Sequence, residues 1–356
     1  MRTLNGAWTY SWQGEKTEQF AAKYHTILEA VQQKVGAANV TYLPGVSYNM
    51  KPEGKWYDES ADQLEAAVAA AQQADVVLLC LGENSYAEKP GDLSDLYLSD
   101  LQTQFAQRLT ATGKPVVLVL NEGRPRVLSR FEQPIKAVVQ TYLPGNFGGD
   151  ALADILYGDV NPSGKLPYTY PRYPNAIISY IHKYSDEQKR GEGVYNYEAD
   201  YNPQWEFGHG LSYTTFKYSN LTVDKTTLGK TDQVTVRVQV TNTGAREGKE
   251  AVHLYSSDLA ASQIAPDVRR LRRFDKVSLQ PAETKTVTFT LPMSELAYAG
   301  RTGEPVLEAG DFDLRIGDQV KRITLRLVPA PPAKKAVLLP AKRQLRSAAA
   351  NGVVAR

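Results

Sequence analysis

The chain has 356 residues, of which 42% are hydrophobic and 22% charged, and its formal net charge is +2. This balance is ordinary for a soluble protein with room for two hydrophobic cores, and it excludes a strongly charged partner such as nucleic acid or a membrane surface for the chain as a whole. The single cysteine, Cys80, excludes an intrachain disulfide, and the absence of a run of 18 apolar residues argues against a transmembrane helix.

Helices and buried strands alternate over the first 160 residues. Apolar side chains recur at helical spacing over residues 17–35, and Gly36 follows them, so an amphipathic helix is predicted there. A short strand is expected at 40–43, and an alanine-rich helix is expected at about 60–74.

The apolar run Val76–Leu81 and the polar loop after it organise this part of the chain. A run with β-branched residues and no alternation is typical of a strand covered on both faces, so Cys80 within it is expected to be buried. Gly82 ends the strand, and Glu83 is the first carboxylate beyond it. Because open α/β sheets bind ligands outside the carboxyl ends of their strands, Glu83 is a candidate for chemistry. The alternative is a solvated acidic loop without a chemical role.

The pattern continues with a helix that Ser99 is expected to cap, strands at 116–120 and 137–139, and a short helix at 149–157. This alternation predicts a doubly wound, mostly parallel sheet, which is an α/β sandwich. No GxGxxG motif follows a strand, which argues against a nucleotide-binding Rossmann unit. Arg124 follows the strand at 116–120, so it is expected to face the same crevice as Glu83.

The second half of the chain has a different character. Residues 161–217 are rich in Pro, Gly, Tyr and Asn and predict an irregular connector. From about residue 218 the hydrophobic period becomes two, most clearly at 234–240, which predicts an all-β sandwich of immunoglobulin or fibronectin type III kind over 218–328. We therefore place a domain boundary near residue 217. The tail, 329–356, combines Pro and Ala with basic residues and no acidic one, and its composition predicts disorder.

Four segments, in this order, resemble glycoside hydrolase family 3, the β-glucosidase and exo-glucanase family. They are GENSYAEKPGD at 82–92, NEGRP at 121–125, YLPGNFGGDALADILYGDVNPSGKLPYTYP at 142–171 and NPQWEFGHGLSYTTF at 202–216. The resemblance covers residues 4–328, and it implies that residues 1–160 are the α/β sandwich domain of the family and 218–328 its fibronectin type III-like domain.

The resemblance also implies a mechanism and a set of site residues. Retaining glycosidases use two carboxyl groups about 5–5.5 Å apart, and in this family the nucleophile is an Asp on an N-terminal (β/α)₈ barrel while the acid/base is a Glu on the sandwich domain. Glu83 matches the acid/base position, and Glu88 is the runner-up because some members carry acids at both places. Trp8, in the segment LNGAWTY, matches a Trp that stacks on a sugar ring. Glu88, Asp92 and Arg124 are expected to bind substrate; alternatively, Asp92 positions Glu83 and Arg124 shapes the loop.

Two functions stay open at this point. The first is the C-terminal portion of a retaining β-glucosidase that acts on a β-linked glucoside or oligosaccharide. Such a portion is either a truncation or fragment of a longer chain or the product of a split gene whose barrel domain is on a separate chain, and little activity is expected from these residues alone. The second is a non-catalytic module that binds carbohydrate or a partner. No cofactor or metal is expected, because the histidines show no metal-ligand spacing. The N-terminus does not read as a signal peptide, and the resemblance suggests a periplasmic or secreted location.

These assignments make a structural prediction. The acidic loop and the Trp8 segment are expected to lie together at the carboxyl edge of the sheet, with Glu83, Glu88, Asp92, Trp8 and Arg124 facing solvent in a loop with few ordering contacts. If the Glu83 carboxylate is instead buried against an Arg or Lys of its own domain and points away from Trp8, a structural role for Glu83 is favoured and its acid/base assignment ends.

Overall fold

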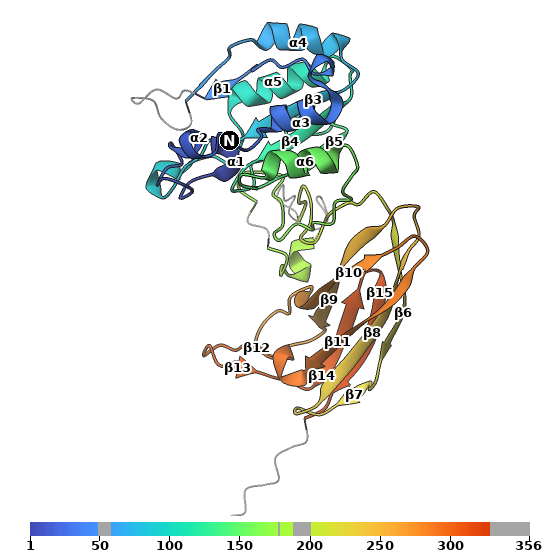
Figure 1. The fold of residues 1–356 in the computed structure, drawn as a ribbon. Helices are drawn as coiled ribbons and strands as arrows, with labels where there is room; N and C mark the ends of the chain where they lie inside the picture. Colours follow the sequence, from blue (N-terminus) through green and yellow to red (C-terminus); the bar gives the residue numbers. More distant parts are fainter. Residues whose placement is uncertain (49–57, 177–178, 188–200, 328–356) are drawn as a thin grey trace, which may run out of the picture.

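The computed structural model describes residues 1–48, 58–176, 179–187 and 201–327 (Figure 1). Its N-terminal part is built on a three-stranded parallel sheet with the order β3-β4-β5. The strands are β3 (Val77–Gly82), β4 (Val116–Asn121) and β5 (Ala137–Gln140). The central strand β4 is almost entirely buried, as its continuous apolar sequence predicts.

Helices cover both faces of this sheet, as Figure 1 shows. On one face α4 (Leu64–Gln73) and α5 (Asp100–Thr110) pack on a cluster of buried apolar side chains that includes Leu79 and Leu81 of β3. On the other side α3 (Ile27–Val35) and α6 (Gly148–Leu156) pack against each other. The predicted doubly wound α/β sandwich is therefore confirmed.

Strand β3 differs from its prediction in one respect. It is an edge strand of the sheet, and its side chains alternate between the two faces. Leu79 and Leu81 face the helices, whereas Cys80 points to the opposite face and is exposed. The expectation that Cys80 is buried was wrong, because a continuous apolar sequence does not reveal which strand lies at the edge.

The expected helix over 17–35 is interrupted. The structure has α2 (Thr17–Phe20), a non-helical stretch, and then α3, which begins after Thr26. The Thr26 side chain accepts a hydrogen bond from the Glu29 backbone N–H (3.3 Å), and the Glu29 carboxylate accepts one from the Thr26 N–H (2.8 Å). This capping box starts a new helix at that point. Residues 40–43 form no strand, since they pair with no other strand of the described residues.

The remaining elements before the C-terminal sandwich are short. They are α1 (Arg2–Asn5), η1 (Ala37–Asn39), η2 (Lys89–Gly91), η3 (Tyr184–Glu187) and the antiparallel pair β1 (Ser47–Tyr48) and β2 (Glu59–Ser60). Ser99 caps α5 as predicted, because its hydroxyl accepts a hydrogen bond from the Gln102 N–H at 3.1 Å. No helix among the described residues is long and apolar enough to cross a membrane.

The C-terminal part is an all-β sandwich of two sheets, with the orders β10-β9-β14-β15-β7 and β11-β8-β6. Its elements are β6 (Phe216–Val223), β7 (Thr227–Leu228), β8 (Gln233–Asn242), β9 (Gly248–Asp258), β10 (Arg270–Leu279), β11 (Thr284–Pro292), η4 (Met293–Leu296), β12 (Tyr298–Ala299), β13 (Pro305–Val306), β14 (Gly310–Ile316) and β15 (Gln319–Leu325). Every second residue of β8, from Val234 to Val240, is fully buried between the sheets. The period of two read from the sequence is therefore the core pattern of a sandwich.

The segment between the two sandwiches packs against both. Tyr170 is fully buried and pairs with Trp205 in an isolated antiparallel bridge, and Lys183 pairs in the same way with Asp267 next to β10. The boundary near residue 217 and the assignment of residue ranges to domains stay predictions. The tail predicted over 329–356 lies outside the described residues.

Candidate active-site loop

The acidic loop begins where β3 and β4 end side by side. Gly82 is paired with Asn121, and the Glu83 N–H continues the pairing by donating to the Asn121 carbonyl at 2.9 Å. Gly82 has a φ of 147°, and a Cβ atom at this position would lie 2.0 Å from the Asn121 carbonyl oxygen. Only glycine allows this close approach, which turns the chain so that Glu83 points toward the segment after β4.

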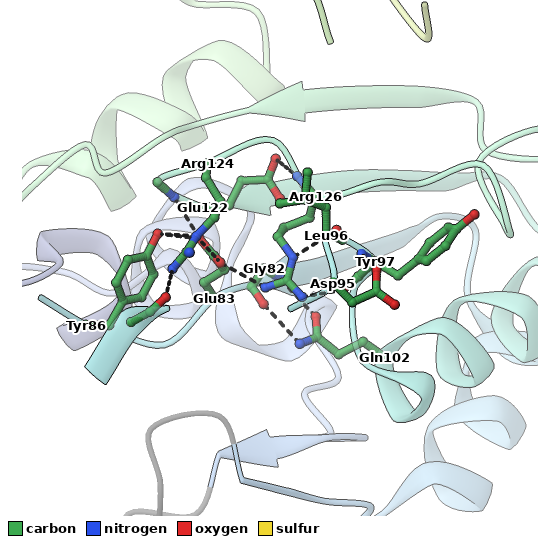
Figure 2. Close-up of polar contacts among 12 residues, drawn as sticks. Gly82, Glu83, Tyr86, Asp95, Leu96, Tyr97, Gln102, Glu122, Arg124 and Arg126 are labelled. Atoms are coloured by element: carbon green, nitrogen blue, oxygen red, sulfur yellow. Dashed lines mark hydrogen bonds and ion pairs between the residues drawn. The ribbon is translucent and has the colours of Figure 1, made fainter. Parts of the chain in front are cut away.

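The Glu83 side chain is buried, with 1% of its surface exposed. One carboxylate oxygen lies 2.9 Å from Arg126 Nη1 and 3.1 Å from Arg124 Nε. The other accepts hydrogen bonds from the Tyr86 hydroxyl (3.0 Å) and the Gly123 N–H (3.2 Å). Figure 2 shows Glu83 enclosed by these side chains. The expectation that Glu83 faces solvent was wrong, and its burial against two arginines meets the first half of the condition that favours a structural role.

The physical reason for this burial is the segment after β4. Its sequence NEGRPR brings two guanidinium groups and a backbone N–H over the carboxylate, so this domain itself supplies the enclosure that was expected only from a second domain. A buried carboxylate is tolerated when charged partners and hydrogen bonds surround it in this way.

The same two arginines hold the acidic loop. Arg124 donates from Nη2 to the Gly91 carbonyl (2.7 Å) and lies over the Tyr86 ring, with its Cζ 4.0 Å from the ring centroid. Arg126 donates from Nε to the Leu96 carbonyl (3.1 Å) and from Nη2 to the carbonyl of the next residue. The loop therefore has many contacts within its own domain, contrary to our expectation, and Arg124 shapes it as predicted.

The Trp8 segment lies against the other side of the acidic loop, which confirms that the two are neighbours. Gln13 Oε1 accepts a hydrogen bond from the Ala87 N–H (2.8 Å), and Gln13 Nε2 donates one to the Ala87 carbonyl (3.1 Å). The Ser85 hydroxyl donates to the Gln13 carbonyl at 2.8 Å. Trp8, five residues before Gln13, has 68% of its surface exposed.

Glu88 directly follows Ala87, and we call the pair of Gln13–Ala87 hydrogen bonds the Gln13 clamp. It is exposed, and so is Asp92 at the end of the loop. Within the described residues no hydrogen bond or ion pair engages the Glu88 carboxylate, and the residue has a positive φ of 52°. A positive φ in a glutamate costs free energy and persists only where the surroundings impose it. The clamped loop thus presents Glu88, rather than Glu83, to solvent beside the Trp8 segment.

Sequence reasoning missed a second buried carboxylate, Glu122. It is fully buried, and one of its oxygens accepts hydrogen bonds from the Tyr170 hydroxyl (2.8 Å), the Gln140 amide (3.1 Å) and the Arg126 N–H (3.3 Å). Its other oxygen has no hydrogen-bonding partner in the described residues. Burial is the main cause that raises the pKa of Glu122 to about 8, and the nearby Glu83 charge adds to it.

This raised pKa predicts a pH-dependent stability. Between the ordinary glutamate pKa and about 8, the unfolded chain has lost the Glu122 proton while the folded chain keeps it. The free energy of unfolding therefore falls as pH rises through this window, by up to about 1.4 kcal/mol per pH unit. Glu122→Gln is expected to flatten this slope in urea unfolding at pH 5, 6.5 and 8, whereas the exposed Glu304→Gln is not. A slope that Glu122→Gln leaves unchanged would show that Glu122 is already ionised in the folded chain.

No group of three or more potential metal ligands is present among the described residues. Among the histidines, His182 is buried and its ring lies 2.8 Å from the Glu187 carboxylate. His209 stacks on Trp205, with ring centroids 6.4 Å apart.

Comparison with known proteins places the chain among the glycoside hydrolases. Residues 2–213 match the glycosyl hydrolase family 3 C-terminal domain, and residues 250–320 match a fibronectin type III-like domain. The chain belongs to glycoside hydrolase family 3, and its α/β sandwich lies within the match to the C-terminal domain of that family.

Individual relatives agree with this assignment. A lysosomal beta glucosidase of Dictyostelium discoideum is 39% identical over 90% of this chain, and a beta-xylosidase of Formosa agariphila is 34% identical over 86%. The solved structure of a β-glucosidase from Erythrobacter marinus has 33% identity and a TM-score of 0.74 over 85% of this chain and 43% of its own. The chain spans only 38% and 41% of the lengths of the two curated relatives.

Proposed function

We propose that this chain supplies the general acid/base of a retaining β-glycosidase and that Glu88 is the residue that carries it. The supporting observation is the position of Glu88, which is exposed, free of partners within the described residues, and presented by a loop that Gln13 and Arg124 hold from two sides. A general acid must come within hydrogen-bonding reach of the glycosidic oxygen. Glu88 meets this requirement for a substrate that approaches the loop from solvent.

Glu83 does not meet it. With 1% of its side chain exposed and four polar partners around it, its carboxylate has no path to a substrate oxygen unless the Arg124 and Arg126 contacts open first. We assign Glu83 and the two arginines to positioning, since together they fix the course of the loop that carries Glu88. Trp8 and Asp92, both exposed, are proposed to contact the sugar.

The second carboxylate of the reaction is proposed to come from the barrel domain that the family resemblance implies. A retaining mechanism needs a nucleophile about 5–5.5 Å from the acid/base, on the other side of the bond that is cleaved. The relatives are more than twice as long as this chain, which leaves room in them for such a domain. One of the two relatives is named a glucosidase and the other a xylosidase, so the sugar accepted by this chain is left open between them.

One observation supports the alternative of a non-catalytic binding module. Trp8, Tyr10 and Trp12 expose 68%, 43% and 47% of their surfaces, and Trp8 and Tyr10 both have positive φ angles. Strain of this kind costs about 1–3 kcal/mol per residue and often marks a binding surface. Aromatic faces of this type can bind sugar without any chemistry.

Hydrolysis separates the two functions. The chain alone is expected to hydrolyse 4-nitrophenyl β-glucoside and β-xyloside at background rates, because acid catalysis without a nucleophile is only part of the mechanism. Addition of the N-terminal part of the Dictyostelium relative, which this chain does not match, is expected to give turnover. Binding of cellobiose with no turnover in the mixture would favour the binding module, and turnover by the chain alone would show that it carries its own nucleophile.

A further inference from the structure

Glu122 is a buried carboxyl group that the proposed catalysis does not use. It directly follows β4 and begins the segment 122–127, which lies against the acidic loop (Figure 2). Arg126 Nε and the Val127 N–H both donate to the Leu96 carbonyl, at 3.1 and 2.8 Å. The position of the loop therefore depends on the position of the segment that contains Glu122.

The two buried carboxyl groups next to this segment are held differently. Glu83 has donors on both oxygens, and the guanidinium groups of Arg124 and Arg126 both face it. Glu122 has three donors on one oxygen, none on the other, and no ion pair within the described residues. A buried carboxylate without a cation is costly, so this site fits Glu122 in its protonated form. The raised pKa of Glu122, about 8, agrees with this geometry.

The groups that face Glu122 leave it as the one that titrates. The acidic loop contributes the charge of Glu83, β5 contributes the neutral amide of Gln140, and Arg126 contributes its backbone N–H while its guanidinium binds Glu83. The remaining titratable neighbours are three tyrosines that follow β5 or belong to the connecting segment: Tyr142, Tyr168 and Tyr170. Burial raises the pKa of each tyrosine, so all three stay neutral while Glu122 ionises.

Glu122 lies between two parts of the chain that are held in different ways. On one side Tyr170, whose hydroxyl donates to Glu122, belongs to the hydrophobic cluster of the sheet and packs edge to face on Trp205. On the other side the acidic loop is largely exposed over 88–95, and the side chains of the segment 122–127 hold it by polar contacts. Parts with few buried apolar contacts open most readily. The loop is therefore the side from which water can reach Glu122.

We infer that protonated Glu122 is a positioning residue for the acidic loop and that its ionisation releases the loop from the segment 122–127. An ionised Glu122 puts a second negative charge near Glu83 in a site whose two cations are already bound to Glu83. Water can compensate this charge only if the loop opens. The consequence for catalysis rests on the proposed function, because release of the loop takes Glu88 out of position as pH rises.

Hydrogen exchange of the 356-residue chain, followed by mass spectrometry from pH 5.5 to 9, tests this inference. Between the ordinary glutamate pKa and about 8, Glu122 keeps its proton in the closed loop and loses it in the opened one. The opened population is therefore expected to rise about tenfold per pH unit in this window and to level off above it. Protection factors of residues 88–97 report this population. They are expected to be lower than those of β4 at every pH, because the loop opens without the sheet.

Two variants separate Glu122 from other groups. Glu122→Gln imitates the protonated form and is expected to make the protection of residues 88–97 independent of pH, whereas the exposed Glu304→Gln is expected to keep the original slope. Tyr170→Phe removes a hydrogen bond that favours the ionised form of Glu122. In that variant the levelling-off is expected to move to higher pH, and an unchanged levelling-off would contradict the inference.

Three further results would overturn it. Protection of 88–97 that does not vary with pH, while that of β4 falls, would link Glu122 only to unfolding of the whole sheet. A slope confined to residues 166–172 would mean that water enters from the connecting segment instead. A slope that persists in Glu122→Gln would assign the effect to another group. Because exchange needs no catalysis, the inference can fail while Glu88 remains the acid/base, and it can hold if Glu88 is not.

Discussion

Glu83→Gln is expected to lower the free energy of unfolding by about 3–5 kcal/mol, the usual cost of removing one partner from a buried ion pair. The substitution keeps the shape of the side chain but leaves two guanidinium groups beside a neutral amide. Arg126 is 10% exposed and Arg124 24% exposed, so water can only partly replace the lost charge. Urea unfolding at pH 7 measures the loss.

The matched control is Glu88→Gln, five positions further along the same loop. This exposed carboxylate has no partner within the described residues, so its loss is expected to change the free energy of unfolding by less than about 0.5 kcal/mol. The two variants make the same chemical change in the same loop, and only burial and pairing distinguish them. Equal, small effects would mean that the Glu83 cluster is looser in solution than its contacts indicate, and Glu83 would again be a candidate for chemistry.

Local patterns predicted much of the architecture because they depend on nearby residues. The alternation of Val234 to Val240, the serine cap at residue 99 and the apolar strand at 116–120 all needed only a short stretch of chain. The break within 17–35 was also readable, since Thr26 and Glu29 have the spacing of a capping box. In that segment the apolar periodicity continues across the cap, so periodicity alone predicts one uninterrupted helix.

The candidate site was harder to predict because its chemistry depends on contacts between distant parts of the chain. Glu83 and Arg126 are 43 residues apart, and no local pattern indicates that the arginine closes over the carboxylate. The Gln13 clamp on Ala87 spans 74 residues and carries no sequence signal of its own. The position of Glu83 at a strand end was predicted, but its burial follows from the course of the next loop. The only sequence feature that pointed to this burial was the pair Arg124 and Arg126, which follows the end of β4.

The largest expected effect on activity belongs to Glu88. In a mixture with a barrel-bearing chain, Glu88→Ala is expected to lower kcat/KM for 4-nitrophenyl β-glucoside by about 10²–10⁴-fold, the usual contribution of a general acid/base. Glucosides with a poor leaving group need protonation most, so the loss is expected to grow as the pKa of the leaving alcohol rises. With 2,4-dinitrophenyl β-glucoside, whose leaving group needs no proton, the first step is expected to be almost unaffected.

Azide provides the deciding test, because it attacks the covalent glycosyl-enzyme without a general base. It is expected to restore turnover of the dinitrophenyl glucoside by Glu88→Ala and to form glycosyl azide, since the removed side chain leaves space beside the sugar. Glu83→Gln is expected to show no such rescue, because its effect comes from a displaced loop and not from a missing base. Azide rescue of a Glu83 variant together with full activity of Glu88→Ala would reverse the assignment. The two carboxylates are close in sequence, but the structure gives them opposite environments, and we propose that the exposed one exchanges a proton with the substrate.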